Sequence, residues 1–321
     1  MNICLVGYGM IAEHHVRALG TLEDIHFHWL VGRRPEPTLA FAKEWEFEHH
    51  TLELTEALAD DSVDAVVITS PNALHAAQAT AALNAGKHVL LEIPIAMTLA
   101  NAQALAALAQ QANRTLMICH SMRFLRAFTY IRHLVDDGRF HMVQFLGNFF
   151  IRRRTNITAT GNPRSWTDNI LWHHGAHLID LAMWLGNSSS AERISYHPGP
   201  DYRQQGTMDM CLTMTLSSGA IATIAQSYFT PGFDMQVLVI GYEDTFLWKN
   251  KTLYNFEGKI LVPKQSIMDL VDQNTEFIVA LRENRPPTIT PETIMPTMQL
   301  ITQAQTIAES EPPTGSHPPN F

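Results

Sequence analysis

The stretch Ile3-Cys4-Leu5-Val6-Gly7-Tyr8-Gly9-Met10-Ile11-Ala12 decides the fold of this 321-residue chain. Four apolar residues that suit a buried strand lead into the pattern G-x-G-x-x-A, and a helical pattern starts at Met10. In this context the first glycine allows a tight turn, the second lets the backbone approach a pyrophosphate, and the alanine allows close helix–strand packing. The helix N-terminus adds free N–H groups for the phosphates. The stretch therefore predicts a dinucleotide site with Gly7, Gly9, Met10 and Ile11 at the cofactor.

Short apolar runs and helical patterns keep alternating up to about residue 120. The runs lie at 27–31, 65–69, 89–92 and 115–119, with helical patterns between them. Alternation of this kind is typical of a doubly wound parallel sheet. We therefore predict an N-terminal Rossmann domain over residues 1–121.

The pattern changes after residue 121, where one helical stretch at 130–136 is followed by long strand-like segments. In the segment 208–216 every second residue is apolar, which is the period of a sheet with one buried face. Helical patterns return near 269–283 and 291–309, where Pro296 should kink or delay the helix. We predict an α+β domain with a large, mainly antiparallel open sheet over 122–310, followed by a loose tail over 311–321.

Composition restricts the class of protein further. A hydrophobic fraction of 46% with 17% charged residues indicates a globular chain and excludes a coiled-coil protein or a disordered tail protein. No apolar run reaches the roughly 18 residues that cross a bilayer, and the N-terminus lacks the basic region of a signal peptide, so we expect a cytoplasmic protein without a membrane partner. The net charge of −9 disfavours nucleic acid. Cys4, Cys119 and Cys211 lie in strand-like stretches and are expected to be buried hydrophobes.

Arg33 and Arg34 follow the second predicted strand, where an NAD-preferring site would usually carry a carboxylate for the ribose 2′-hydroxyl. A guanidinium pairs with a 2′-phosphate, which a carboxylate would repel. The pair therefore predicts NADP as the cofactor, with NAD as the alternative. Two solvated loop arginines are the plain structural interpretation.

Several further motifs, in this order and spacing, resemble the Gfo/Idh/MocA (glucose-fructose oxidoreductase/inositol dehydrogenase) family. They are Thr69-Ser70-Pro71-Asn72 with His75, Ala85-Gly86-Lys87-His88-Val89 running into Glu92-Ile93-Pro94, and Gly175-Ala176-His177 followed by Asp180. The resemblance spans most of the chain. It implies a Rossmann domain, a C-terminal domain whose open sheet commonly makes a homodimer or homotetramer, and an active site in the cleft between them. It also implies cofactor contacts from Ser70, Asn72, His75 and Glu92.

Two positions depart from the family pattern. The family usually has Lys where this chain has Ile93, and often has Asp where this chain has His173. One branch of the family is similar in both departures, with the strongest likeness over 148–154 and 161–177. That branch implies NADP-dependent oxidation of a cyclic hemiacetal (lactol), formed by 4-carboxy-2-hydroxymuconate-6-semialdehyde, to the lactone 2-pyrone-4,6-dicarboxylate.

The histidines of 172–184 are the candidate catalytic groups. A helix there places His173 and His177 one turn apart on one face and rotates His174 away. Because imidazole titrates near working pH, we predict that His177 is the base and that His173 assists it or binds the substrate. A lactol hydroxyl is more acidic than an ordinary alcohol, so one histidine suffices without the lysine. Asp180 either orients His177 or is structural.

Two histidines four residues apart near a carboxylate also resemble half a metal site. No further ligand pair stands in a recognisable motif, and hydride transfer to a nicotinamide needs no metal, so we expect none.

A carboxylated substrate needs cations, and guanidinium groups bind carboxylates bidentately. Arg152 and Arg154 would share one face of a strand, and Trp166 and Trp172 either wall a planar ring or pack in the core. The candidate substrate residues are Ile93, Pro94, Arg123, Arg152, Arg154, Arg164, Trp166, Asp168, Trp172 and His174.

The leading hypothesis is thus an NADP-dependent oxidoreductase acting on the hemiacetal or hydroxyl carbon of a carboxylated small molecule. One alternative is a sugar or polyol dehydrogenase, which Ile93 and the density of arginines disfavour. Another is a catalytically silent NADP-binding regulator, which the missing lysine favours and the His173–His177 block disfavours.

Overall fold

The computed structural model describes residues 1–152, 169–199 and 207–310, and the chain divides into two compact units. Unit 1 contains Met1–Ser121 and Met268–Met295, and unit 2 contains Met122–Ile267 and Pro296–Phe321. Residues 268–295, which the sequence analysis assigned to the second domain, therefore belong to unit 1. The reason is tertiary, because α8 (Val271–Arg282) packs on α1 (Met10–Leu19).

Unit 1 is built on a six-stranded parallel sheet with strand order β3-β2-β1-β4-β5-β6. This order is that of the dinucleotide-binding doubly wound fold, so the predicted Rossmann domain is confirmed. The strands are β1 (Asn2–Val6), β2 (His26–Val31), β3 (His49–Thr51), β4 (Ala65–Ile68), β5 (His88–Leu91) and β6 (Leu116–Ile118). The remaining helices are α2 (Pro35–Glu44), α3 (Leu54–Leu58), η1 (Asn72–Leu74), α4 (His75–Asn84) and α5 (Leu99–Gln111).

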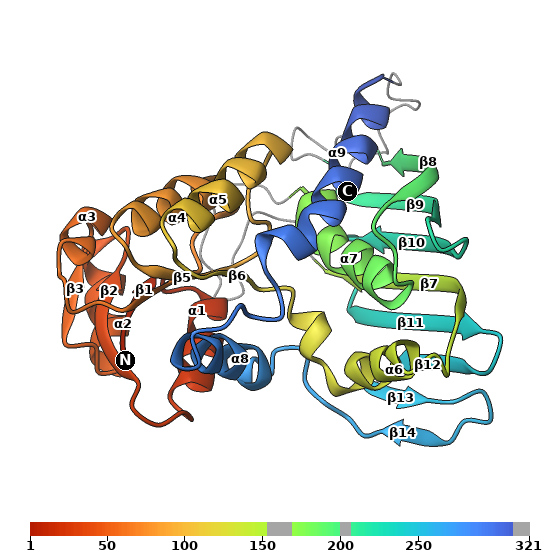
Figure 1. Cartoon of the computed structure of the whole chain (residues 1–321), viewed down its shortest axis with the longest axis horizontal. Coiled ribbons are helices and arrows are strands. Elements are labelled where there is room, and N and C mark those ends of the chain that lie inside the picture. Colours follow the sequence, from red (N-terminus) through yellow and green to blue (C-terminus); the bar gives the residue numbers. More distant parts are fainter. Residues whose placement is uncertain (153–168, 200–206, 311–321) are drawn as a thin grey trace. The chain divides into compact units, whose positions relative to one another are not determined.

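The central strands of this sheet are buried because helices cover both faces. Figure 1 shows α4 and α5 along one face and α1 with α8 on the other. All four residues of β4 are 0% exposed, which explains their continuous apolar run. The helix boundaries follow local chemistry, since Gly86 adopts a φ of +72° just after α4 and Thr98 caps α5 by accepting a bond from the Asn101 N–H at 3.2 Å.

Unit 2 contains an eight-stranded sheet with strand order β14-β13-β12-β11-β7-β10-β9-β8. Among the described strands of this sheet only β7 and β10 pair in parallel, which confirms the predicted mainly antiparallel sheet. The strands are β7 (Met142–Ile151), β8 (Ala191–Pro198), β9 (Asp209–Leu216), β10 (Ile221–Ser227), β11 (Phe233–Gly241), β12 (Thr245–Lys249), β13 (Thr252–Tyr254) and β14 (Ile260–Val262).

The helical segments of unit 2 are η2 (Ser121–Phe124), α6 (Arg126–Asp136), η3 (Leu171–Gly175) and α7 (Ala176–Leu185), and α9 (Pro291–Ser310) extends into it. In Figure 1, α6 and α7 lie against the same face of the large sheet. That face is apolar, as the alternation in β9 predicted: Met210, Leu212, Met214 and Leu216 are at most 3% exposed. Pro296 lies inside α9, which continues through it.

The three cysteines are free thiols, and one of them differs from expectation. Cys4 and Cys119 are buried, but Cys211 is exposed. The expectation of a buried Cys211 was wrong because it occupies the outward-facing position between two inward-facing residues of β9.

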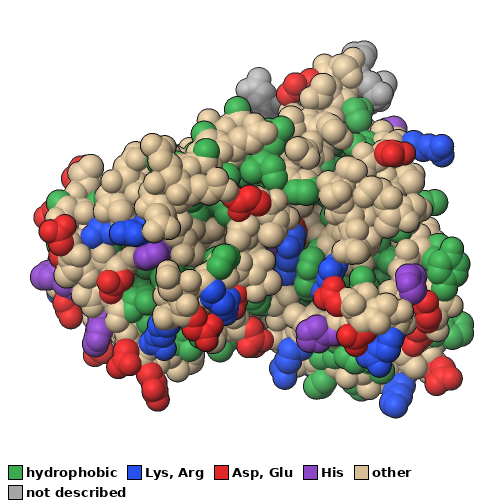
Figure 2. All heavy atoms as spheres, in the orientation of Figure 1, with side chains coloured by type: hydrophobic (Ala, Val, Ile, Leu, Met, Phe, Trp, Pro, Cys, Tyr) green, Lys and Arg blue, Asp and Glu red, His purple; other side chains and the backbone are tan. Residues whose placement is uncertain are grey.

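The helices and the charged side chains at the surface agree with what the composition indicates about membranes and charge. No helix among the described residues is long and apolar enough to span a membrane. On the face that Figure 2 shows, Lys and Arg side chains lie scattered among acidic and uncharged ones.

Candidate functional site

The glycine turn of unit 1 has the geometry that a dinucleotide requires. Gly7 adopts a φ of +113°, and a Cβ there would lie 2.6 Å from Thr69 Oγ1, so a side chain is excluded. A Cβ on Gly9 would meet nothing within 4 Å, which leaves room in front of α1. Gly9 also offers no capping side chain to the first N–H groups of the helix. The turn therefore fits a pyrophosphate, and Met10 and Ile11 begin the helix behind it.

The two predicted arginines lie close to this turn. Both are exposed, and Arg34 immediately precedes α2. Arg34 Nε lies 3.4 Å from the hydroxyl of Tyr8, the residue between the two glycines. A guanidinium thus stands where Rossmann folds hold the ribose 2′ substituent.

His75 connects two segments at the carboxyl edge of the unit 1 sheet. The side chain is 1% exposed, with Nδ1 2.8 Å from the Pro94 carbonyl and Nε2 2.8 Å from the Ser70 carbonyl. Burial lowers the pKa of His75, and a neutral imidazole donates from one nitrogen only. Ser70 donates to Gln78, and Asn72 begins η1.

Ile93 precedes Pro94 and occupies the position where the family usually has lysine. Its side chain is buried, with 3% of its surface exposed. An aliphatic group there holds the segment in place and moves no proton.

Glu92 is the centre of a buried polar cluster that sequence reasoning missed. Its carboxylate lies 2.8 Å from Nε2 of His15 and accepts a hydrogen bond from the Cys119 thiol. The other ring nitrogen of His15 lies 3.1 Å from Asn274 Oδ1 on α8. His15 lies on the buried face of α1, and a histidine at that position was the signal in the sequence that could have revealed the cluster. Asn274 gave no such signal, because it lies 259 residues away along the chain.

His15, Glu92 and Cys119 offer metal-ligand atoms within 4.8 Å of one another. Burial raises the pKa of Cys119 well above its ordinary value, and Glu92 raises it further. Metal binding at this cluster would require the buried thiol to lose its proton.

In unit 2 the helix predicted over 172–184 does not start as a regular α-helix. Residues 171–175 form the π-helical turn η3, in which the Gly175 N–H donates to the Ile170 carbonyl at 2.8 Å, and α7 starts only at Ala176. A Cβ on Gly175 would lie 2.9 Å from Met210 Cε and 3.0 Å from the Ile170 carbonyl oxygen. Glycine therefore permits the wide turn to pack against β9. Turns of this kind occur frequently at functional sites.

The rings of His173 and His174 contact each other within the π turn. Both are half-buried, and their ring centroids lie 4.2 Å apart in an edge-to-face arrangement. Nδ1 of His174 lies 2.7 Å from the hydroxyl of Tyr228, a residue that is 3% exposed and that the sequence did not indicate. His177 is half-buried in the first turn of α7.

Asp180 and Arg123 form a buried ion pair in unit 2. Arg123 donates to Asp180 from Nε at 2.7 Å and from Nη2 at 2.5 Å, and Thr297 donates to the same carboxylate at 3.1 Å. Arg123 is 8% exposed and its guanidinium lies over the Trp184 ring. This placement differs from the substrate-facing cation that the sequence analysis expected, and it favours the structural role left open for Asp180.

The other candidate substrate residues are placed only in part. Trp172 is 5% exposed and its Nε1 donates to Gln305 at 3.3 Å, which fits core packing. Arg152 is exposed and lies one residue beyond the end of β7. Four candidates lie outside the described residues: Arg154, Arg164, Trp166 and Asp168.

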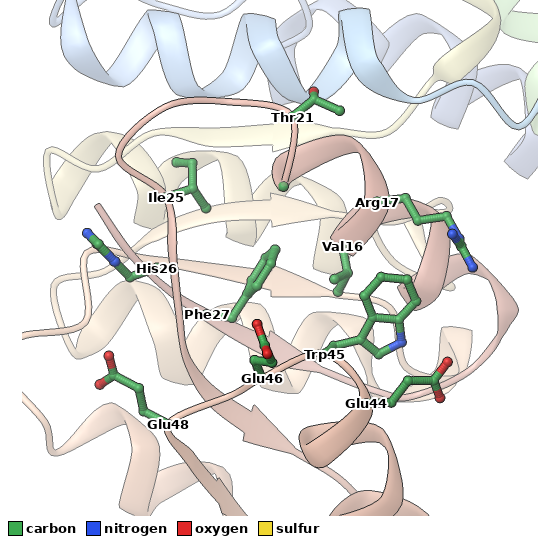
Figure 3. Close-up of a pocket in the computed structure, with 11 residues that line it drawn as sticks. Val16, Arg17, Thr21, Ile25, His26, Phe27, Glu44, Trp45, Glu46 and Glu48 are labelled. Carbon is green, nitrogen blue, oxygen red and sulfur yellow. The ribbon is translucent and has the colours of Figure 1, made fainter.

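A cavity of about 620 Å³ opens elsewhere on unit 1, between the end of α1, the start of β2 and the segment after α2. Figure 3 shows Trp45 and Phe27 within it and Glu44, Glu46 and Glu48 along its margin. It lies at the amino end of β2, whereas dinucleotides bind at the carboxyl ends of such strands. The cavity is therefore separate from the glycine turn.

Comparison with known proteins finds a family match in each unit. Residues 1–120 match the oxidoreductase family with an NAD-binding Rossmann fold (GFO_IDH_MocA), and residues 126–262 match the C-terminal domain of bacterial oxidoreductases. The 4-carboxy-2-hydroxymuconate-6-semialdehyde dehydrogenase of Sphingobium sp. (strain NBRC 103272 / SYK-6) is 33% identical over 299 residues, which is 89% of this chain and 92% of that relative.

Of two further matches, one covers part of the chain and the other covers nearly all of it. The 1-carboxy-3-chloro-3,4-dihydroxycyclo hexa-1,5-diene dehydrogenase of Comamonas testosteroni is 42% identical over 138 residues, or 42% of this chain and 34% of that relative. Among solved structures, GenD2 from gentamicin A biosynthesis in complex with NAD matches with a TM-score of 0.83 at 22% identity. That match covers 97% of this chain and 94% of the other, and it shows that the fold is shared.

Proposed function

Because the chain belongs to the Gfo/Idh/MocA oxidoreductase family of NAD(P)-dependent dehydrogenases acting on CH–OH groups, we propose that it oxidises a carboxylated cyclic hemiacetal with NADP. The most concrete substrate is the lactol of 4-carboxy-2-hydroxymuconate-6-semialdehyde, and the product is then 2-pyrone-4,6-dicarboxylate. The observation that carries this proposal is the similarity along 92% of the relative named for that semialdehyde. A second relative named for a carboxylated ring diol supports the substrate class.

The residues of unit 2 supply the acid–base part of the reaction. NADP, when bound, accepts the hydride that leaves the hydroxyl-bearing carbon. His177 accepts the hydroxyl proton, and His173 assists it at the start of the same helical segment. Tyr228 holds His174 through the 2.7 Å contact and so fixes the backbone turn that carries both groups. A lactol hydroxyl is acidic enough for an imidazole base, which accounts for the buried Ile93 in place of lysine.

The residues of unit 1 bind and orient the cofactor. The glycine turn and the N-terminus of α1 take the pyrophosphate, and the exposed Arg34 beside Tyr8 pairs with a 2′-phosphate. His75 keeps the Ile93–Pro94 segment against the end of β4.

The direct test is the near-ultraviolet absorbance of reduced nicotinamide. Purified protein and NADP are mixed with freshly generated 4-carboxy-2-hydroxymuconate-6-semialdehyde, and the assay is repeated with NAD and with a panel of neutral sugars and polyols. We expect fast NADPH formation with the semialdehyde alone. Turnover of sugars only would replace this proposal by a polyol dehydrogenase, and tight NADP binding without any turnover would indicate a silent regulator.

We also infer a homo-oligomer that forms through the outer face of the large sheet. Leu247, Leu238 and Leu146 stand side by side on β12, β11 and β7 and are half-exposed, although their strand neighbours facing the helices are buried. A dimer or tetramer would cover this apolar row. Light scattering after size-exclusion chromatography tests it: Leu238→Asp should yield a monomer, whereas a monomeric wild type would contradict the inference.

A further inference from the structure

A cluster of histidine and carboxylate side chains lies at the outer edge of the unit 1 sheet, apart from the glycine turn, and one of its members, Glu48, also stands at the margin of the cavity at the end of α1. His28 comes from β2, His49 from the edge strand β3, Glu48 from the residue before β3, and Asp60 from the segment after α3. Metal-ligand atoms of His28, Glu48 and His49 lie within 4.8 Å of one another. Nothing in the proposed dehydrogenase chemistry uses these groups.

An irregularity in β2 brings the cluster together. The parallel register of β1 on β2 pairs Ile3 with Phe27 and then Cys4 with Trp29, so that His28 is an extra residue in the strand. Such a bulge redirects a side chain that regular alternation would send to the opposite face. His28 and Trp29 consequently both approach His49, with ring centroids 5.0 and 4.8 Å from it.

The two nitrogens of His28 have different carboxylate neighbours. Nδ1 lies 2.6 Å from Glu48 Oε2, and Nε2 lies 2.9 Å from Asp60 Oδ2 and 3.0 Å from the Ser62 hydroxyl. Asp60 is held in turn by the indole N–H of Trp29 at 2.9 Å and by the Ser62 N–H and hydroxyl at 2.9 and 2.6 Å.

This is the arrangement that orients histidine ligands in metal sites. A ligating imidazole almost always donates its second N–H to a carboxylate, a backbone carbonyl or water, which fixes the ring and its tautomer. Asp60 occupies that second position behind His28, on the side away from Glu48. The other nitrogen of His28, Nδ1, faces Glu48, and His49 completes the set of ligand atoms within 4.8 Å of one another.

We propose that His28 Nδ1, His49 and Glu48 bind one divalent zinc-class ion, with Asp60 orienting His28 from behind. Two imidazoles and one carboxylate favour Zn²⁺ or Co²⁺ over Mg²⁺ and Ca²⁺, which prefer oxygen ligands. Three protein ligands with water as the fourth is an arrangement that zinc sites use, at about 2.0–2.2 Å per nitrogen or oxygen ligand. The ion would link the short edge strand β3 to β2.

Side-chain exposure at the cluster suits ion capture. The Glu48 side chain is 57% exposed and His49 is exposed, so both can close on an ion entering from solvent, whereas His28 is 12% exposed and held from behind. The rigid ligand thus lies at the base of the site and the adjustable ligands lie at its mouth.

The test is calorimetric titration of tag-free, chelator-treated full-length protein with Zn²⁺, and titration with Co²⁺ followed by its visible absorption. We expect one equivalent of bound ion and a Co²⁺ spectrum of low coordination number. Glu48→Gln and His49→Ala change exposed side chains, so the fold should persist, and each should weaken binding at least tenfold. Asp60→Asn should weaken it about 10- to 100-fold.

The matched control is His50→Ala, which removes the neighbouring exposed imidazole of the same strand and should bind Zn²⁺ as the wild type does. Thermal midpoints should rise with Zn²⁺ concentration in wild type and His50→Ala but not in His49→Ala. Absence of saturable Zn²⁺ uptake by the wild type would overturn the proposal and leave His28 as an imidazolium bridging two carboxylates. Equal uptake by Glu48→Gln, His49→Ala and wild type would equally overturn it. Neither outcome bears on the dehydrogenase proposal, because no readout uses turnover.

Discussion

His177 has the central part in the proposed chemistry at the scale of single residues. Changing His177 to Ala removes the base, and we expect kcat to fall by about 10²–10⁴. NADPH affinity, measured by fluorescence titration, should stay unchanged because the cofactor residues lie in unit 1. His197→Ala, which alters an exposed histidine of unit 2, is the control. Normal turnover by His177→Ala would show that the base is another group.

Arg34 sets the preference for NADP over NAD if its guanidinium binds the 2′-phosphate of NADP. Arg34→Ala should weaken NADPH binding about 10- to 100-fold, as expected for losing a charged hydrogen bond, and leave NADH binding nearly unaltered. Arg139→Ala, at an exposed arginine of unit 2, should change neither affinity. Equal losses for both cofactors would point to damage of the glycine turn, and no loss would leave Arg34 as a solvated loop residue.

The Arg123–Asp180 pair makes a prediction about stability. Arg123→Met leaves the 1% exposed Asp180 carboxylate without its bidentate partner, so unfolding free energy should fall by about 3–5 kcal/mol. Arg17→Ala breaks a pair whose side chains are 59% and 42% exposed and should cost under about 1 kcal/mol. Urea unfolding measures both. A small loss for Arg123→Met would mean that the remaining partners of the carboxylate, Thr297 among them, suffice to hold it.

The π turn matters at the scale of elements, because it sets where His173, His174 and His177 stand. Gly175→Ala would place a methyl group 3.0 Å from the Ile170 carbonyl oxygen and 2.9 Å from Met210, so we expect about 1–3 kcal/mol of destabilisation and a lower kcat. Gly232→Ala is the matched control, since a Cβ there meets nothing within 4 Å. Thermal unfolding and steady-state kinetics measure the two effects. Wild-type values for Gly175→Ala would show that the turn tolerates a side chain and has no steric role.

Residues 268–295 complete unit 1 at the scale of the whole molecule, and Glu276 links α8 to the segment that follows it. Hydrogen bonds from Arg285 chiefly hold the pKa of Glu276 below its usual 4.5, and Thr288 bonds lower it further. A depressed folded pKa contributes stability that is present above pH 4.5 and lost as the pH falls through the folded value. Glu276→Gln should therefore be less stable than wild type at neutral pH, and the difference should shrink below pH 4.5.

Urea unfolding across a pH series checks this dependence. Glu23→Gln, at an exposed glutamate of the same unit, should stay within about 0.5 kcal/mol of wild type at neutral pH. A difference between wild type and Glu276→Gln that persists unchanged in acid would assign the effect to packing instead of charge.

The sequence by itself determined the features that depend on neighbours along the chain. The apolar run and the spacing of the glycines over 3–12 identified the dinucleotide turn. The alternation of apolar and polar residues over 208–216 identified the large sheet and its buried face. These predictions succeeded because backbone sterics and the burial of one face act within a few residues.

Only the tertiary structure decided which distant groups meet. His15 with Asn274, Arg123 with Asp180, and His28 with Asp60 are joined across 259, 57 and 32 residues, and none belongs to a local pattern. The bulge at His28 and the π turn before α7 likewise arise where packing overrides regular spacing. The physical reason is that a buried polar atom needs a partner wherever the fold supplies one, and sequence separation does not restrict that choice.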